Sequence, residues 1–358
     1  IQTNLISEVQ EYAFNSLRGM SGSAVMIDCE NGGVNCMVST PSFDNNEFSN
    51  GVSNKRWQSL INDKQKPLLN KSIAGLYAPG STLKLLTALH VLSDQNFNAN
   101  KEFFCNGHVE LGSHKFHCWK REGHGSINLF EAIKQSCDCY FYNLAKTIKI
   151  NSLAKLCRKF SIGELTNIDI PNEFKGIMPS TQWKKKRMGE KWHLGETFNT
   201  VIGQGFTLST PLQLSIMTAR IASGKKVTPT ILRNKNKVFD KINLSEKDLS
   251  FIRESMFAVV NEYKGTAFSS KLSGKHTMAG KTGTSQVRRI SVLERETGVL
   301  ENKELPYDLR DHSIFTCYAP YKNPKFALSV LVEHMGSGSK IAAPIAKNIM
   351  ELTLKKYL

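Results

Sequence analysis

The chain has 358 residues, 40% of them hydrophobic, which is enough for one large domain or two modest ones. Its 47 Lys and Arg outnumber 31 Asp and Glu, so the net charge is +16 and an anionic partner or surface has to be considered. The basic residues are scattered, however, and no nucleic-acid-binding motif accompanies them, so we expect no nucleic-acid partner. No apolar run is long enough to span a bilayer.

The chain begins at Ile1 rather than at a methionine, so we expect it to be a fragment of a longer protein. A missing anchor or signal then says nothing about the full-length protein. Eight cysteines are too few for a disulfide scaffold, but four of them lie within residues 105–139.

The first elements in chain order are a helix and a hairpin. Apolar residues recur at helical spacing over 5–18, and two strand-like runs, 24–29 and 34–39, flank the turn at Asn31-Gly32-Gly33. A polar stretch that we expect to be irregular leads to a helix beginning at or beside Ser81. Further helical patterns occupy 127–160 in pieces, 210–223 after Pro211, and 246–263.

Strand-like runs return late in the chain, at 277–279 leading into Gly280-Lys281-Thr282-Gly283-Thr284, at 313–318 and at 326–332. A helix over 341–357 follows. Strands at both ends with helices between them predict one partly antiparallel sheet built from distant segments, in an α/β or α+β domain with a helical insertion. We expect the polar stretches 161–199 and 288–311 to be surface loops.

Ser81 and Lys84 lie in the stretch "APGSTLKLLTAL" of residues 78–89, where a lysine enters an otherwise apolar helix. Three residues apart, they share one helix face. The pair has two interpretations. It is either an N-cap with a lysine that reaches solvent, or a nucleophile beside its base.

Ser-x-x-Lys alone is weak evidence, because it recurs at Ser152, Ser223 and Ser337. The order of three motifs is more informative: Ser81-x-x-Lys84 at a helix start, Ser136-Cys137-Asp138 at a join between helices, and Lys281-Thr282-Gly283 leaving a strand. This set is typical of enzymes that acylate a serine. The alternative makes Ser81 a cap, Ser136 a turn residue and Lys281 a solvated strand end.

A second group of reactive side chains reads Cys105-x12-Cys118-x5-His124-x12-Cys137. Four ligands of this type can hold zinc tetrahedrally. The spacing matches no short-range zinc finger, and disulfides or inert buried thiols remain alternatives. His108, His114, His117 and Cys139 are competing ligands.

Long stretches of the chain together resemble the transpeptidase domain of class B penicillin-binding proteins. They are "MVSTPSFDNNEF", "PLLNKSIAGLYAPGSTLK", "GHGSINLFEAIKQSCDCYFY", "IGQGFTLSTPLQL", "AGKTGTSQ", "RDHSIF" and "VEHMGSGSKIAAPIA". Within that family, the sequence is similar to the elongation-type penicillin-binding protein 2 of Gram-negative bacteria. Asp138, rather than Asn, at the end of the middle motif favours the elongation type over the septal type.

The resemblance implies a fold shared with serine β-lactamases: a five-stranded antiparallel sheet flanked by helices, plus an all-helical subdomain. Residues 1–358 would form one transpeptidase domain, with the sheet part at about 1–75 and 265–358 and the helical subdomain at about 80–225. The membrane anchor and pedestal expected at the N-terminus of the full-length protein would lie outside this chain.

The implied activity is peptidoglycan D,D-transpeptidation, the cross-linking of stem peptides during cell-wall elongation and the determination of cell shape. Ser81 would be the nucleophile and Lys84 its base, kept neutral by the apolar helix and by the positive charge of Lys281. Ser136 would relay the proton, and Asp138 would order the network. Lys281, Thr282 and Thr284 would bind the substrate carboxylate, and Gly283 would leave room for the substrate along the strand.

The same resemblance implies covalent inhibition by β-lactams at Ser81. It also implies a protein anchored in the inner membrane with this domain in the periplasm. Its partners would be a glycosyltransferase and scaffold proteins of the elongation complex, bound through the absent N-terminal region. Alternatives are a β-lactamase or D,D-carboxypeptidase, for which no dedicated deacylating glutamate is evident, and a penicillin-sensing domain.

Some elongation-type relatives hold a structural zinc beside the active site. His124 and Cys137 match that pattern, whereas Cys118 and Cys105 stand where some relatives have aspartates. We therefore expect a structural zinc held by Cys105, Cys118, His124 and Cys137, with Cys105 the least secure of the four.

Overall fold

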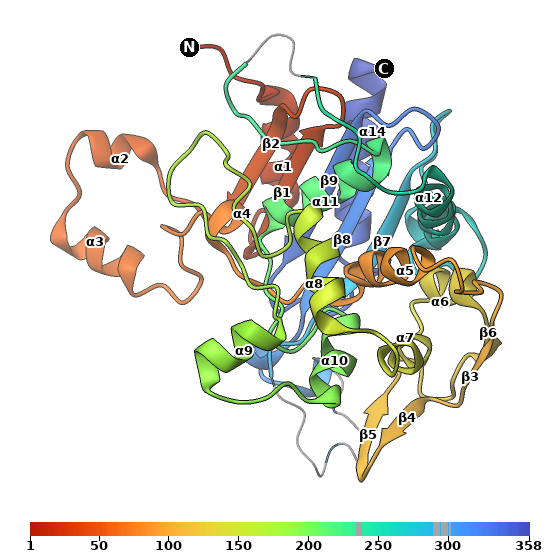
Figure 1. Cartoon of the computed structure of the whole chain (residues 1–358). Helices are drawn as coiled ribbons and strands as arrows, with labels where there is room; N and C mark the ends of the chain where they lie inside the picture. The colour runs from red at the N-terminus through yellow and green to blue at the C-terminus, as the bar shows by residue number, and fades with distance from the viewer. Residues whose placement is uncertain (234–237, 289–293, 295–299, 301) are drawn as a thin grey trace.

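The structure is a computed structural model that describes all residues except 234–237, 289–293, 295–299 and 301 (Figure 1). The main sheet consists of β1 (Gly22–Asp28), β2 (Val34–Thr40), β7 (Ala279–Ser285), β8 (His312–Ala319) and β9 (Phe326–Val332). Four short strands form two small two-stranded sheets: β3 (Phe103–Cys105) with β6 (Gly125–Ile127), and β4 (His108–Leu111) with β5 (His114–His117).

The helices surround the sheet and fill the middle of the chain. They are α1 (Ser7–Ser16), α2 (Asn45–Ser49), α3 (Asn54–Ile61), α4 (Lys71–Ala74), α5 (Lys84–Leu92), α6 (Leu129–Lys134), α7 (Asp138–Ala145), α8 (Ile150–Lys159), α9 (Thr181–Met188), α10 (Leu194–Val201), α11 (Pro211–Ser223), α12 (Glu246–Asn261) and α14 (Ala342–Tyr357), with short 3-10 turns η1 (Gly80–Thr82), η2 (Phe268–Ser270), η3 (Asn302–Glu304) and η4 (Tyr307–Leu309).

The five strands lie in the order β2-β1-β9-β8-β7, and every neighbouring pair is antiparallel. Gly22 on β1 pairs with Thr40 on β2 and with Val332 on β9, so the two ends of the chain meet in one sheet. The predicted sheet and its assembly from distant segments are confirmed. Strand β7 is an edge, which leaves one side of its backbone open for other partners.

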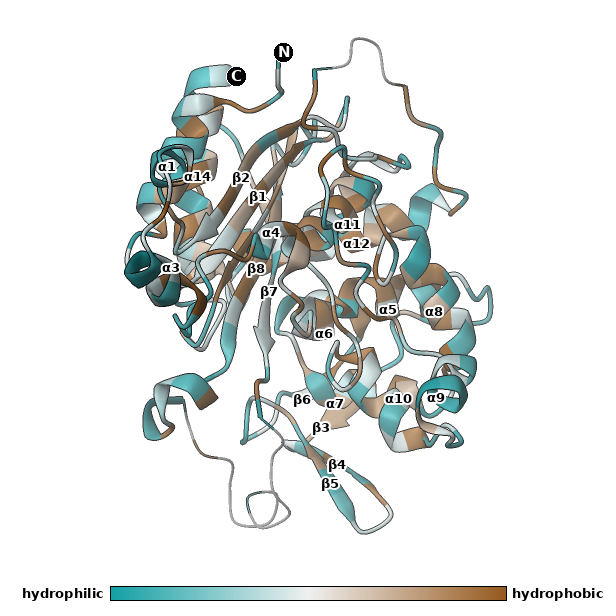
Figure 2. Cartoon of the chain, turned by 90° about the vertical axis from the view of Figure 1, so that its left-hand side faces the viewer, coloured by the Kyte–Doolittle hydropathy of each residue, from teal (hydrophilic) through white to brown (hydrophobic). Residues whose placement is uncertain are grey.

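Alternation along β1 explains why the sheet is covered on both faces. Ala24 and Met26 belong to the core cluster that contains residues of α1 and α14, whereas Val25 and Ile27 belong to the cluster that contains residues of α5 and α11. Successive strand residues point to opposite faces, so both sets are buried. Figure 2 shows α1 and α14 on one side of the sheet and the larger helical part on the other.

Helix α11 begins where the sequence signals it. The Thr210 hydroxyl accepts from the Gln213 amide at 3.2 Å, and the Gln213 side chain accepts from the Thr210 amide at 3.0 Å. Pro211 occupies the first turn and Gly224 ends the helix at φ +68°. The Ser215 hydroxyl contacts the carbonyls of Val25 and Ala327, each at 3.1 Å, which fixes the helix to the sheet.

Two stretches expected to be irregular contain helices. Residues 41–80 include α2, α3 and α4, and 161–199 includes α9 and most of α10. These helices are short, α2, α3 and α9 are polar, and side-chain caps start several of them. The Ser180 hydroxyl, for example, accepts from the Trp183 amide at 3.1 Å. The expected loop at 288–311 falls largely outside the described residues, although η3 and η4 lie within it.

Within the described part of the chain, no helix is both long enough and apolar enough to cross a bilayer. The division into a sheet part and a helical subdomain at the expected residues stays a prediction, although all five main strands lie within the expected sheet ranges. The range expected to be all-helical, about 80–225, also contains the four short strands β3–β6.

Candidate active site and metal centre

The turn that carries Ser81 lies against the open edge of the sheet. Gly80 adopts a left-handed backbone with φ +54°, and its amide donates to the Gly203 carbonyl at 2.9 Å. A Cβ atom built on Gly80 would lie 2.3 Å from the carbonyl oxygen of Thr284 on β7. Only glycine satisfies both conditions, so the sequence Pro-Gly-Ser places Ser81 next to strand β7.

Replacing Gly80 with alanine is expected to destabilise the fold by on the order of 2–4 kcal/mol, from left-handed strain plus overpacking. It should also slow reaction at Ser81, because Thr284 has to move. The matched control is Gly189→Ala, where φ is +74° but no atom lies within 4 Å of the added Cβ. Urea unfolding of both variants measures the difference, and equal losses of stability would contradict this packing.

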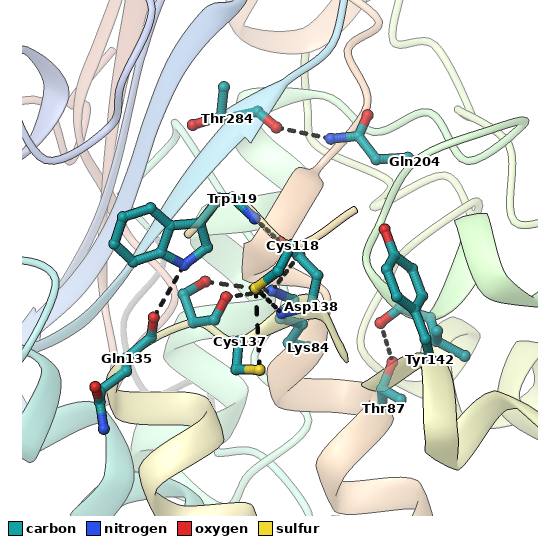
Figure 3. A network of polar contacts seen from close by, with 12 residues as sticks. Lys84, Thr87, Cys118, Trp119, Gln135, Cys137, Asp138, Tyr142, Gln204 and Thr284 are labelled. Carbon is teal, nitrogen blue, oxygen red and sulfur yellow. Dashed lines mark hydrogen bonds and ion pairs between the residues drawn. The ribbon is translucent and has the colours of Figure 1, made fainter. Parts of the chain in front are cut away.

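Lys84 lies in the first turn of α5 with its side chain fully buried. Its Nζ lies 2.7 Å from Asp138 Oδ1 (Figure 3). The same Nζ donates to the Ser136 carbonyl at 2.8 Å and lies 3.4 Å from Ser136 Oγ. Ser136 and Asp138 come from the join between α6 and α7, as expected. Ser136 has φ +57°, an uncommon conformation for a serine that is typical of functional sites.

Lys281 approaches the same serine from the sheet. On β7, it is fully buried and donates to Ser136 Oγ at 2.8 Å. Burial, reinforced by the neighbouring Lys84, lowers the pKa of Lys281 well below the ordinary lysine value. Among the described residues, Lys281 has no carboxylate within ion-pair distance, whereas Lys84 pairs with Asp138. The expected roles of the two lysines, Lys84 as the neutral base and Lys281 as the cation that binds a carboxylate, stay predictions.

Because the pKa of Lys281 is depressed in the folded chain, we expect the free energy of unfolding to depend on pH. Between its folded and unfolded pKa values the unfolded chain binds more protons, so the free energy of unfolding rises with pH through that interval. Lys281→Met removes this dependence. The stability of the unsubstituted chain relative to Lys281→Met should therefore increase as the pH is raised from about 7 toward about 10.

Urea unfolding at several pH values checks this, with Lys155→Met, which removes an exposed lysine of α8, as the control. The expectation is contradicted if the free energy of unfolding of the unsubstituted chain, minus that of Lys281→Met, stays constant or decreases as the pH rises.

The three motifs surround one cavity of about 410 Å³. Ser81, Ser136, Asp138, Thr282, Gly283 and Thr284 all line it, and Lys84 and Lys281 lie behind Ser136. Gly283 faces the Ser81 turn closely: an added Cβ would lie 3.0 Å from the Thr82 side chain and 3.1 Å from the Pro79 carbonyl. The structure therefore brings together every catalytic and substrate-binding residue selected from the sequence.

Sequence reasoning missed several residues of the cavity wall. The Gln204 side chain donates to the Thr284 carbonyl at 2.8 Å and so positions the strand (Figure 3). Trp119 also lines the cavity and is 59% exposed. Its backbone amide donates to Asp138 Oδ2 at 2.9 Å, and its indole N–H donates to the Gln135 carbonyl at 3.1 Å. Gln204 lies inside the quoted stretch "IGQGFTLSTPLQL", which was the only available signal for it.

Cys105, Cys118, His124 and Cys137 converge behind this cavity, with their ligand atoms all within 4.8 Å of one another. His124 Nδ1 lies 3.6 Å from both Cys105 Sγ and Cys118 Sγ, and Cys118 Sγ lies 4.0 Å from Cys137 Sγ. Tetrahedral zinc with ordinary bond lengths would separate S from N by about 3.5 Å and S from S by about 3.8 Å. The residues thus fit a zinc ion.

The environment of the four residues agrees with this fit. All eight cysteines are free, so no disulfide engages the three sulfur ligands. The Asp138 amide donates to Cys118 Sγ at 3.3 Å, a contact typical of thiolates that bind metal. The competing candidates His108, His114, His117 and Cys139 are not part of the four-residue cluster.

Comparison with known proteins gives a consistent result. The family model described as the penicillin binding protein transpeptidase domain matches residues 22–351. Peptidoglycan D,D-transpeptidase MrdA of Haemophilus influenzae is 34% identical over 98% of this chain and 55% of that protein, and MrdA of Escherichia coli K12 is 33% identical over 95% and 56%. This chain therefore spans little more than half the length of these relatives.

Solved structures show the same similarity. The penicillin-binding protein PBP2 of Helicobacter pylori, solved in complex with MreC, superposes with a TM-score of 0.91 at 37% identity, covering 100% of this chain and 64% of that one. Pseudomonas aeruginosa PBP2 in complex with WCK 5153 gives a TM-score of 0.87 at 33% identity, covering 99% and 78%. The chain therefore belongs to the family of penicillin-binding protein transpeptidase domains.

Proposed function

We propose that this chain is the catalytic unit of a peptidoglycan D,D-transpeptidase of the elongation type. The observation that carries the proposal is the contact of both Lys84 and Lys281 with Ser136, beside Ser81 and the open edge of β7 in one cavity. A nucleophile, two amines and a relaying hydroxyl are what acyl transfer from a peptide requires.

In the first step, the Ser81 oxygen attacks the carbonyl of the penultimate D-alanine of a stem peptide. Lys84, as the free amine, takes the hydroxyl proton, and Ser136 passes a proton to the nitrogen of the terminal D-alanine. The peptide C–N bond breaks, an ester forms on Ser81, and D-alanine leaves as the free amino acid. The buried contacts of Lys84 hold it in place for this transfer.

Substrate placement would use the open side of β7. The donor peptide lies along Lys281–Thr284 as an added strand, and Gly283 gives its backbone room. The terminal carboxylate binds Lys281 and the Thr282 and Thr284 hydroxyls, and this negative charge favours the protonated form of Lys281. The amides of Ser81 and Thr284 flank the reacting carbonyl as oxyanion donors.

In the second step, the amine of a neighbouring stem peptide attacks the ester carbonyl and gives up a proton along the same path. The C–O bond to Ser81 breaks, an amide cross-link forms, and the serine is restored. β-Lactams would acylate Ser81 by opening their ring amide. No observation favours the alternatives, a penicillin-sensing domain or a β-lactamase or D,D-carboxypeptidase.

The test of this function follows the fate of the acyl group. A thioester donor ending in a D-alanyl group is incubated with the chain and an amine acceptor, and transfer and hydrolysis products are separated by chromatography. We expect transfer to exceed hydrolysis as the acceptor concentration rises. Hydrolysis alone at every acceptor concentration would identify a carboxypeptidase, and a stable acyl-enzyme without turnover would identify a sensor.

The metal proposal is separate. Cys105, Cys118, His124 and Cys137 would hold zinc as a structural ion with four protein ligands and no open position. Cys137 adjoins Ser136 and Asp138, and Cys118 contacts the Asp138 amide, so the ion would fix the Ser136–Asp138 segment from behind. Zinc would supply stability to the site rather than chemistry in the reaction.

The relatives support a proposal about location and partners as well. A transpeptidase of this family would work at the periplasmic face of the inner membrane, anchored by a segment outside this chain. The MreC complex of the Helicobacter pylori protein supports a scaffold partner, and the structure of a peptidoglycan synthase complex that coordinates polymerization and crosslinking, 25% identical to this chain, supports a glycosyltransferase partner. Co-purification of the full-length protein with such partners tests both.

A further inference from the structure

A second cavity, of about 660 Å³, adjoins the active site. It lies between the segment around Trp119 and Lys120, helix α6 at Glu131, and the turn from Tyr263 to Thr266 that follows α12. Trp119 and Thr266 line both cavities, so these two side chains form the boundary between them.

The boundary lies where the leaving group of the proposed reaction departs. Thr266 Oγ1 is hydrogen-bonded to Thr282 Oγ1 at 2.7 Å, which places the Thr266 side of the boundary at the carboxylate-binding end of β7. On the opposite wall, the Trp119 amide contacts Asp138, two residues from the proton relay Ser136. The terminal D-alanine, held by its carboxylate and protonated through Ser136, therefore leaves beside Trp119 and Thr266.

An incoming amine has to occupy the position that the leaving amine vacated. Attack of an amine on the ester is the chemical reverse of the acylation step, so the same proton relay and oxyanion donors serve both directions. The acceptor peptide consequently extends away from Ser81 past Trp119 and Thr266. The N-terminal part of the donor peptide would then occupy the other part of the active-site cavity, which Gln286 and Asn302 line.

The charges of the second cavity suit an anionic peptide. Lys120 and Lys264 line it, and neither has an ion-pair partner among the described residues. Its acidic residue Glu131 shares the Lys134 ammonium with Glu262, at 3.1 and 3.0 Å, and accepts from the Gln135 side chain at 2.8 Å. Two lysines against one glutamate among the lining residues still give the cavity a net positive charge, which favours binding of a peptide's carboxylates.

The turn that carries Lys264 has a fixed conformation. Lys264 has φ +67°, uncommon for a lysine, and the amides of Gly265 and Ala267 donate to the carbonyls of Glu262 and Val259 at 3.0 Å each. A Cβ on Gly265 would lie 2.4 Å from the Val259 carbonyl oxygen. Tyr263, 78% exposed, adds an aromatic surface beside the lysine. These features hold Lys264 and Tyr263 at the cavity.

We propose that the second cavity is the acceptor site, which binds the carboxylate-bearing stem peptide whose amine resolves the acyl-enzyme. Lys264 and Lys120 bind its carboxylates, Tyr263 and Trp119 contact its backbone and apolar atoms, and its amine reaches the Ser81 ester between Trp119 and Thr266. This inference rests on the proposed transpeptidase function and names the site of its second substrate.

The test compares two acceptors on the acylated chain. One probe is a synthetic peptide with a single free side-chain amine and two carboxylates, and the other is free D-alanine, which fits within the leaving-group position. Lys264→Glu and Tyr263→Ala are expected to raise the concentration of peptide acceptor at half-maximal transfer by roughly tenfold or more. Transfer to D-alanine and the rate of acylation by the thioester donor should change less than about twofold.

The matched control is Lys247→Glu, the same charge reversal at the exposed beginning of α12. It should leave both acceptors unaffected. Normal acylation with an unchanged peptide dependence in Lys264→Glu and Tyr263→Ala would overturn this inference alone, as would an equal loss of transfer to both acceptors. Absence of acylation in the unsubstituted chain would overturn the proposed function and this inference together.

Discussion

The Ser81→Ala variant is expected to lose turnover of a D-alanyl thioester donor by at least about 10⁴-fold, down to the rate without the nucleophile. The reason is covalent: the acyl group has to form an ester with Ser81, which lines the cavity on the turn that packs against β7 at Gly80 and Gly283. Folding should be unaffected, since Ser81 is only half-buried at the cavity and alanine removes a single oxygen.

Steady-state kinetics measure the loss, and Ser152→Ala is the matched control. Ser152 also lies three residues before a lysine, but it is exposed on α8, so its variant should retain full activity. Residual turnover in Ser81→Ala above about one part in 10³ would assign the chemistry to another group.

Cys137→Ser is expected to remove the metal and to lower the free energy of unfolding by on the order of 3 kcal/mol or more. A serine oxygen is a poor zinc ligand at neutral pH, and the loss leaves two thiols and an imidazole facing each other in a buried space. Because Cys137 lies between Ser136 and Asp138, acylation should slow as well. The measurements are elemental analysis of protein purified without added metal, urea unfolding, and the rate of acylation.

Cys139→Ser is the control for the metal. Cys139 is equally buried, two residues further along in α7, and outside the four-residue cluster. We expect about one zinc per chain in the unsubstituted protein and in Cys139→Ser, and none in Cys137→Ser. A disulfide between Cys105 and Cys118 in the purified protein would rule out the metal site.

Sequence predicts an element of this protein well where neighbouring residues alone determine its conformation. The turn at Asn31-Gly32-Gly33 between alternating strands and the Thr210-Pro211 helix start are local signals, and the structure has β1, β2 and α11 there. Helices such as α9 were missed because their polar sequence has no apolar period, and only caps such as that of Ser180 reveal them.

In the active site, too, sequence predicted the features set by local motifs but not those set by contacts between distant segments. Motif order selected Ser81, Lys84, Ser136 and Lys281, but it did not show which lysine has a carboxylate partner. The carboxylate partner is decided by how β7 packs against the join between α6 and α7. In this packing Lys281 donates to Ser136 and Lys84 pairs with Asp138. The second cavity also escaped prediction, because its walls come from segments more than 100 residues apart in sequence.

The intact mass of the chain after incubation with a penicillin, followed by peptide mapping, shows directly whether Ser81 is the nucleophile. We expect an increase equal to one penicillin per chain, located on the peptide that carries Ser81 and absent from Ser81→Ala. An unchanged mass, or a label on the peptides carrying Ser152, Ser223 or Ser337, would contradict it.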